Sequence, residues 1–177
     1  GEIFFGTTSA GLGASQLLQL TFTGFNGVGA HVASGEFAPT SFNLYVATTG
    51  NDALDGLTIG NAKLTLQDII NDYDLNAGDV INLSAGTYTE KDITLEADDE
   101  GFTIQGAALS SGAPTTIYDS DQTGRWLSFF SANNDNITID KITVKDYKPA
   151  GGTASGGGIN INALDVTGIT VTSCLFD

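Results

Sequence analysis

Apolar residues alternate with polar residues in a series of short stretches that covers most of this 177-residue chain. The clearest stretches are Val80–Leu83, Ile93–Leu95, Phe102–Gln105, Thr116–Tyr118, Leu127–Phe130, Ile137–Val144, Gly158–Ile161 and Ile169–Phe176. A period of two directs one set of side chains into a core and the other toward solvent, as in a half-buried strand. The pattern therefore predicts an all-β protein.

Three of these stretches resemble one another. They read FTIQGA from residue 102, ITIDKI from residue 137 and ITVTSC from residue 169, and their starts are 35 and 32 residues apart. Separations of this size are typical of solenoid repeats, in which each repeat packs on the next. We expect short parallel strands from residue 79 to 177 around one apolar core, with Ile104, Ile139 and Ile169 buried and stacked.

One amphipathic helix is predicted at residues 65–73. Thr65 is a good N-cap residue, and Asp68 stands three positions later, at the spacing of a capping box. Leu66, Ile69, Ile70 and Tyr73 follow the spacing that places side chains on one helix face. A single helix ahead of a series of strands is expected to cover the apolar end of the first repeat.

Residues 1–42 differ from the rest of the chain. They contain no Lys or Arg, their acidic residues are Glu2 and Glu36, and Ala38–Ser41 has the composition of a boundary. Strands are predicted at Glu2–Phe5, Leu17–Phe25 and Val28–Val32. Within the second of them Leu18, Leu20 and Phe22 alternate with polar residues, and an uncharged strand of this kind must be covered by another surface. We interpret residues 1–42 as a separate β-rich segment for assembly or anchoring.

The order of segments in residues 43–177 resembles a known family. NLYVATTGNDALDGL is followed by the helix, by AGDVINLSAGTYTE and by FTIQGA, and later by NITIDKITVKDY and ITVTSCLFD. This order is similar to the opening of the right-handed parallel β-helix of the pectate-lyase-like superfamily. The resemblance implies a solenoid with one N-terminal capping helix. The superfamily includes polysaccharide lyases and hydrolases, bacterial adhesins and phage tail proteins, so the resemblance implies a fold and not a reaction.

The charge and composition of the chain limit the classes of partner that it is expected to bind. The chain carries 21 acidic and 6 basic residues, for a net charge of −15, so nucleic acid is not expected as a partner, because phosphate binding needs a cationic face. No apolar run approaches the roughly 18 residues of a membrane-spanning helix. Cys174 is the single cysteine and lies in an apolar stretch, so a core thiol is expected.

The chemistry-bearing residues are few. Asp52 and Asp55 in NDALDG are the weak candidates for a metal, and calcium is the one cofactor that such acidic loops suggest, although turn formation explains both residues as well. Trp126 and Tyr147 could stack on sugar rings or pack in the core. The family enzymes combine carboxylates with a basic group, whereas here Arg125 is the single arginine and His31 the single histidine, far apart in the sequence.

The sequence therefore favours an extracellular, cell-surface or virion-surface protein with a structural or adhesive role. We expect a homo-oligomer or filament, with Leu18, Leu20, Phe22, Val171, Leu175 and Phe176 as assembly residues. The first alternative is a polysaccharide lyase or glycoside hydrolase acting on acidic glycans, and the second is a noncatalytic carbohydrate-binding module. Alternatively, Val171, Leu175 and Phe176 are covered by further coils of a longer β-helix and not by another copy.

Overall fold

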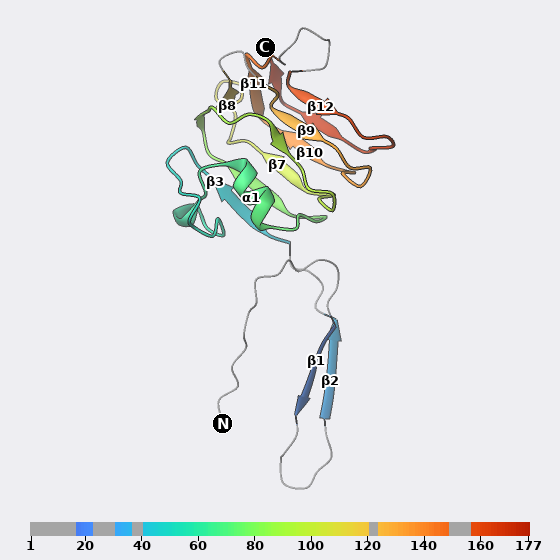
Figure 1. Ribbon diagram of the computed structural model, residues 1–177. Coiled ribbons are helices and arrows are strands. Elements are labelled where there is room, and N and C mark those ends of the chain that lie inside the picture. Colours follow the sequence, from blue (N-terminus) through green and yellow to red (C-terminus); the bar gives the residue numbers. More distant parts are fainter. Residues whose placement is uncertain (1–16, 23–30, 37–40, 121–123, 149–156) are drawn as a thin grey trace. The chain divides into compact units, whose positions relative to one another are not determined.

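The computed structural model describes residues 17–22, 31–36, 41–120, 124–148 and 157–177. The chain divides into two units, residues 1–40 and residues 41–177, so the boundary lies within two residues of the predicted one. In the first unit, strand β1 (Leu17–Phe22) pairs antiparallel with β2 (His31–Glu36) (Figure 1). The second strand continues to Glu36 and does not end at residue 32 as predicted, and the expected strand at residues 2–5 lies outside the described residues.

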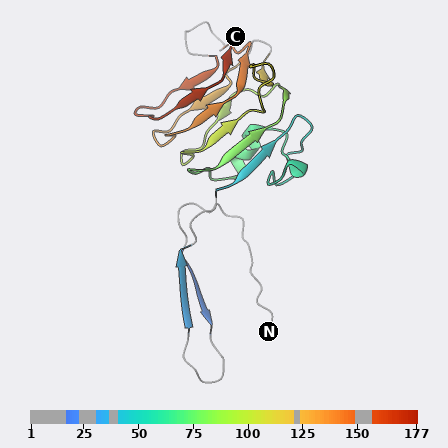
Figure 2. The same ribbon diagram turned by 180° about the vertical axis from the view of Figure 1, so that it is seen from behind.

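The second unit is built from short strands in three parallel sheets (Figures 1 and 2). The first sheet contains β3 (Asn43–Val46), β4 (Val80–Leu83), β7 (Thr103–Gln105), β10 (Thr138–Asp140) and β13 (Thr170–Thr172). The second contains β5 (Gly86–Tyr88), β8 (Thr116–Asp119), β11 (Ile142–Lys145) and β14 (Leu175–Phe176), and the third contains β6 (Ile93–Thr94), β9 (Leu127–Phe129) and β12 (Ile159–Ile161). The prediction of a mainly parallel all-β unit is confirmed.

From β4 onward the chain enters the three sheets in the same order each time, and we call one such passage a round. Residues of successive rounds pair in register, so that equivalent side chains stack. One stack contains Leu44, Ile81, Ile104, Ile139 and Val171. The first four side chains are fully buried, while that of Val171 is 42 % exposed. Ile104 and Ile139 therefore stack as predicted, whereas Ile169 is half-buried and Val171 takes the predicted place of Ile169 in the stack.

Two predicted strands are each divided by a corner. Lys141 separates β10 from β11, and Ser173 and Cys174 separate β13 from β14. Lys141 and Ser173 have positive φ angles of 58° and 51°. In the preceding round Gly106 lies at this corner, where an added Cβ would be 2.0 Å from the carbonyl oxygen of Lys141. The signal in the sequence is a break in the alternation, since Ile139 and Ile142 are both buried but three positions apart. Strand β5 was not predicted. Only Tyr88 among its three residues is buried, so the strand is too short to show an alternation of apolar and polar residues.

Helix α1 (Leu66–Asp72) begins and ends within one residue of the prediction. The Thr65 hydroxyl oxygen accepts a hydrogen bond from the backbone N–H of Asp68 at 3.3 Å, which confirms the N-cap. Leu66, Ile69 and Ile70 are fully buried, and Tyr73 packs against the same core. The helix lies against β3 and β6, the first strands of two sheets, and a short 3-10 helix, η1 (Ile59–Asn61), lies in the loop that precedes it.

Removal of the apolar contact of α1 should destabilise the second unit. We expect Ile69→Ala to lower the free energy of unfolding by about 2–5 kcal/mol, since the side chain is fully buried. Thr65→Ala should lower it by about 0.5–2 kcal/mol through loss of the cap. Urea unfolding followed by circular dichroism measures both changes. Ile59→Ala is the matched control, because Ile59 is 65 % exposed, and an equal effect at both isoleucines would contradict the role of the helix.

Candidate functional site

The edge of the second unit that begins with β3 is closed by backbone hydrogen bonds. Along β3, the Tyr45 N–H donates to the Gly56 carbonyl at 2.8 Å and the Tyr45 carbonyl accepts from the Lys63 N–H at 2.9 Å. The Ala47 N–H donates to the Lys63 carbonyl at 2.9 Å. The loop before α1 thus occupies the side of β3 where another strand would otherwise pair.

The N-terminus of α1 is capped by carboxylates from other parts of the chain. Glu90 accepts hydrogen bonds from the backbone N–H groups of Leu66 at 2.9 Å and Gln67 at 2.7 Å. Asp52 accepts from those of Leu64 at 2.8 Å and Thr65 at 2.9 Å. Burial raises the pKa of Glu90, and the two N–H donors partly oppose that rise. The role of Glu90 was not predicted, because it lies 24 residues after Leu66, the first residue of the helix that it caps.

Lys63 is buried beside the same helix, although lysine is rarely buried without a partner. Its Nζ lies 2.5 Å from the Asp68 carboxylate and 2.7 Å from that of Asp72, and it donates to the Asp52 carbonyl at 2.9 Å. Burial lowers the pKa of Lys63, but the two carboxylates more than offset this and the net pKa is raised. The side chain is therefore a charged structural link between the loop and α1. Asp68 is one of the two ion-pair partners of Lys63, a role that the capping-box spacing did not predict.

Asp52 and Asp55, the predicted metal ligands, are both engaged in local structure. Asp52 caps the helix as described above, and the Asp55 carboxylate accepts from the Leu57 N–H at 3.0 Å. The Asp55 carbonyl accepts a hydrogen bond from the Tyr73 hydroxyl. Within the described ranges no group of three or more His, Cys, Asp and Glu side chains could hold a metal ion. The turn and capping interpretation accounts for both residues, and the structure adds no support for calcium.

The two predicted sugar-stacking residues lie in different environments. Trp126 is fully buried and packs against Tyr118 with ring centroids 5.2 Å apart, so it occupies the core position that the sequence left open beside sugar stacking. Tyr147 is half-buried, its hydroxyl donates to the Glu90 carbonyl, and burial raises its pKa well above the usual value.

Arg125 and Lys145 lie in different parts of the second unit and contact different aspartates. The Arg125 backbone N–H donates to Asp92 at 3.0 Å. Lys145 on β11 forms ion pairs with Asp119 at 3.1 Å and Asp146 at 3.2 Å, both close to the surface. His31 begins β2, where the structure describes only the backbone.

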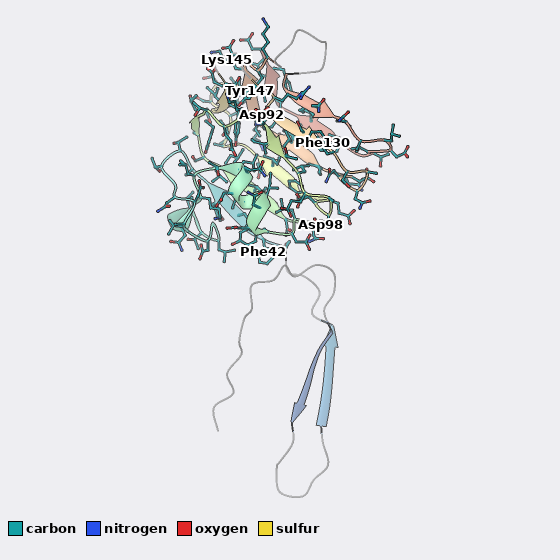
Figure 3. The ribbon with its side chains drawn as sticks, viewed as in Figure 1. Phe42, Asp92, Asp98, Phe130, Lys145 and Tyr147 are labelled. Atoms are coloured by element: carbon teal, nitrogen blue, oxygen red, sulfur yellow. The ribbon has the colours of Figure 1, made fainter. Side chains whose placement is uncertain are left out.

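The opposite edge of the second unit is apolar and open. Strands β12, β13 and β14 are the last in their sheets, and one side of each faces no further strand in the described structure. Val171, Leu175 and Phe176, the three predicted assembly residues in these strands, are 42 %, 50 % and 47 % exposed. Two more apolar residues nearby, Ile161 and Leu164, are also exposed. In Figure 3, Tyr147 and Lys145 mark this edge, while Phe42 lies toward the edge that begins with β3.

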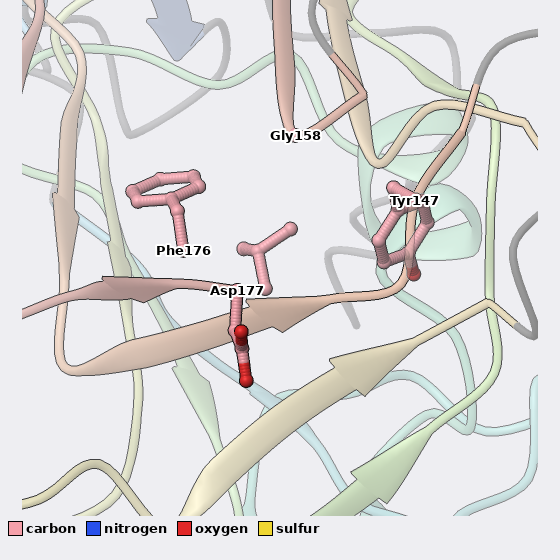
Figure 4. A pocket seen from close by; sticks show the side chains of 5 residues that line it. Tyr147, Gly158, Phe176 and Asp177 are labelled. Carbon is pink, nitrogen blue, oxygen red and sulfur yellow. The ribbon is translucent and has the colours of Figure 1, made fainter.

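A small hollow opens beside this edge (Figure 4). Its volume is about 250 Å³, and it is lined by Val144, Tyr147, Gly158, Phe176 and Asp177. The rings of Tyr147 and Phe176 lie on opposite sides of it, and Gly158 contributes no side chain. The remaining assembly residues, Leu18, Leu20 and Phe22, lie in β1, where the backbone forms a two-stranded sheet with β2. The sequence located the apolar residues of the open edge but gave no sign of the hollow.

A comparison of the chain with protein-family models, curated proteins and solved structures finds no match. The resemblance to the pectate-lyase-like superfamily therefore stays a prediction. In the parts of the chain that the structure describes, no helix has the length and apolar character needed to cross a membrane.

A buried carboxyl lies in the turn that leads into β7. Asp99 is fully buried and accepts hydrogen bonds from the Glu96 N–H at 2.7 Å and the Leu75 N–H at 3.2 Å. In the next round Asn134 holds the equivalent place and donates to the Glu96 carbonyl at 2.7 Å and the Asp99 carbonyl at 3.0 Å. Burial raises the pKa of Asp99 to about 7, helped by the nearby carboxylates of Glu96 and Asp98.

Asp99 should make stability depend on pH near neutrality. Because its folded-state pKa is raised, the folded chain binds the proton more tightly than the unfolded chain. The stabilisation of the fold that comes from this protonation is fully present below the unfolded-state pKa, near 4. It is lost as the pH rises through the folded-state pKa of about 7. Asp99→Asn imitates Asn134, so its unfolding free energy should exceed that of the wild type by a margin that grows by about 3 kcal/mol between pH 5 and pH 8. Urea unfolding at several pH values measures this margin.

The reciprocal variant is the control for that experiment. Asn134→Asp places a second carboxyl in the same series of turns, so the variant should lose more stability at pH 8 than at pH 5. If wild type and Asp99→Asn lose stability in parallel across this range, Asp99 does not carry its proton near neutrality.

Proposed function

We propose that this chain is a structural module of an extracellular or particle-surface assembly, and that its second unit is a short right-handed parallel β-helix. The constant order in which the chain enters three parallel sheets supports this fold, as does the stacking of equivalent side chains. The handedness follows from the strong preference of parallel crossover connections for the right-handed form. In such a fold one apolar core runs through all rounds, and each round covers the previous one.

One observation carries the functional proposal: the core is closed at one edge and open at the other. At the first edge, α1 covers the apolar side chains and the loop before it occupies β3. At the second, Val171 and Phe176 continue two core stacks but are about half exposed. Exposed strand edges with apolar side chains favour association with another strand. We infer that another surface covers this apolar edge, supplied either by a further copy of the chain or by further rounds of the same β-helix.

The overall charge is compatible with this role. A net charge of −15 opposes contact between most parts of two copies. The open edge exposes apolar side chains at Ile161, Val171, Leu175 and Phe176, and it differs from other exposed apolar positions, such as Leu57 and Ile59, in that its strands also have an unpaired edge. Association is therefore expected mainly through this edge. A lyase, a hydrolase or a carbohydrate-binding module would instead need polar groups that converge on a cleft.

Self-association of the 177-residue chain tests the proposal. The average mass measured by light scattering or analytical ultracentrifugation should rise with protein concentration and fall on introduction of charge at the open edge. Val171→Lys should weaken association by about tenfold or more, equivalent to about 1.4 kcal/mol, because the lysine would have to be desolvated in the contact.

Ile59→Lys is the matched control. It adds the same charge at a 65 % exposed isoleucine outside the open edge, and it should leave association unchanged. A wild-type chain that keeps the mass of one copy at all accessible concentrations would contradict the proposal.

A further inference from the structure

A single carboxyl interrupts a column of side-chain amides in the turns that lead into the first sheet. Strands β4, β7 and β10 begin side by side in the register of that sheet. The residues four places before the three strands are Asn76, Asp99 and Asn134, which therefore hold equivalent positions. Asp99 and Asn134 are both fully buried. An amide is neutral at every pH, whereas a carboxyl can ionise, so Asp99 is the titratable member of these three.

The Asp99 carboxyl joins two segments that are far apart in the sequence. One oxygen accepts the Leu75 N–H at 3.2 Å and the other accepts the Glu96 N–H at 2.7 Å. The Glu100 N–H donates in return to the Leu75 carbonyl at 3.0 Å. Leu75 is fully buried and follows Asp72, the last residue of α1, by three places. The turn at residues 96–101 thus fastens the segment that leaves α1 to the stack of strands.

The charged groups with the largest effect on Asp99 are acidic. Within its own turn these are Glu96 and Asp98, both exposed. In the segment that leaves α1, burial raises the pKa of Asp74, and the nearby carboxylates of Asp98 and Asp79 raise it further. The carboxylates of the turn and of the segment that it holds therefore repel one another more strongly as they ionise.

The next turn brings no opposing charge to the Asp99 carboxyl. The Asn134 side chain lies beside it, but this amide is neutral and donates to the backbone carbonyls of Glu96 and Asp99. The ion pairs of Lys63, Lys141 and Lys145 are formed with other aspartates. In these contacts an ionised Asp99 gains two N–H donors but no cation, and a buried charge without a cation is costly.

We propose that Asp99 makes the turn at residues 96–101 a pH-dependent latch, which holds the segment after α1 while the carboxyl is protonated and opens locally when the carboxyl ionises. Opening gives the carboxylate access to water and breaks only the contacts of one turn, so it needs less free energy than global unfolding. Burial raises the pKa of Asp99 to about 7, so the latch is closed at pH 5 and weakens as the pH rises through neutrality. This regulation is independent of the proposed assembly function.

Amide hydrogen exchange of the full chain between pH 5 and pH 8 tests the latch. Rates are divided by those of unstructured peptides at the same pH, which removes the intrinsic effect of base. Protection of the Leu75 and Glu96 amides should fall on the order of 100-fold over this range. The Ser131 amide, which donates to the Asn134 side chain at 3.1 Å in the equivalent turn, should keep its protection. Equal falls at Glu96 and Ser131, or constant protection at Leu75 and Glu96, would overturn the proposal.

Low concentrations of urea separate local opening from global unfolding. Exchange at Thr138, whose N–H donates to the Phe102 carbonyl within the first sheet at 3.0 Å, should accelerate in urea because it requires extensive unfolding. Exchange at Leu75 and Glu96 should not respond, because opening one turn exposes little surface. If these two amides follow Thr138 in urea, the turn does not open by itself and the latch is wrong.

Two substitutions in the same turn identify the group that titrates. Asp99→Asn should abolish the pH dependence at Leu75 and Glu96, and this dependence is the readout because asparagine offers one acceptor oxygen in place of two. Glu100→Gln is the matched control, since it removes one negative charge from an exposed neighbour and should preserve the fall. A fall that persists in Asp99→Asn assigns the effect to another group and contradicts the proposal. Circular dichroism checks that both variants fold, and the wild-type profile decides if either does not.

Discussion

The structure of the second unit depends on the in-register stacking of apolar side chains between parallel strands. Leu44, Ile81, Ile104 and Ile139 form one continuous buried row because each strand pairs with the strand of the round before it. A shift by one residue would turn these side chains to solvent. Register, burial and the repeated order of the sheets are therefore one constraint, and each round is stable only when another surface covers it.

The turns between rounds maintain this register. Gly101, Asn136 and Gly168 hold equivalent places with φ angles of 70°, 56° and 70°, in the left-handed region that glycine and asparagine tolerate best. Beside them the side chains of Asp99 and Asn134 satisfy backbone groups that would otherwise be buried without partners. The same function is thus performed by a carboxyl in one round and an amide in the next, and only the carboxyl adds a dependence on pH.

The two edges of the stack differ because local chemistry covers only one of them. Around α1, Asp52, Glu90 and the buried Lys63 satisfy the helix terminus and fix the loop that occupies β3. At the other edge the rows continue to Val171 and Phe176, which stay about half exposed.

The sequence by itself determined most of the strand positions in the second unit, the helix with its Thr65 cap and the apolar residues of the open edge, because alternation and capping act between residues close together in the chain. It did not show the corners at Lys141 and Ser173, where a positive φ divides what looked like one strand. Only the tertiary structure decided that Glu90 caps α1, that Trp126 is buried and that a hollow forms at Gly158. Each of these depends on which residues of successive rounds become neighbours, and the spacing between rounds varies along the chain because loops of different length connect the strands.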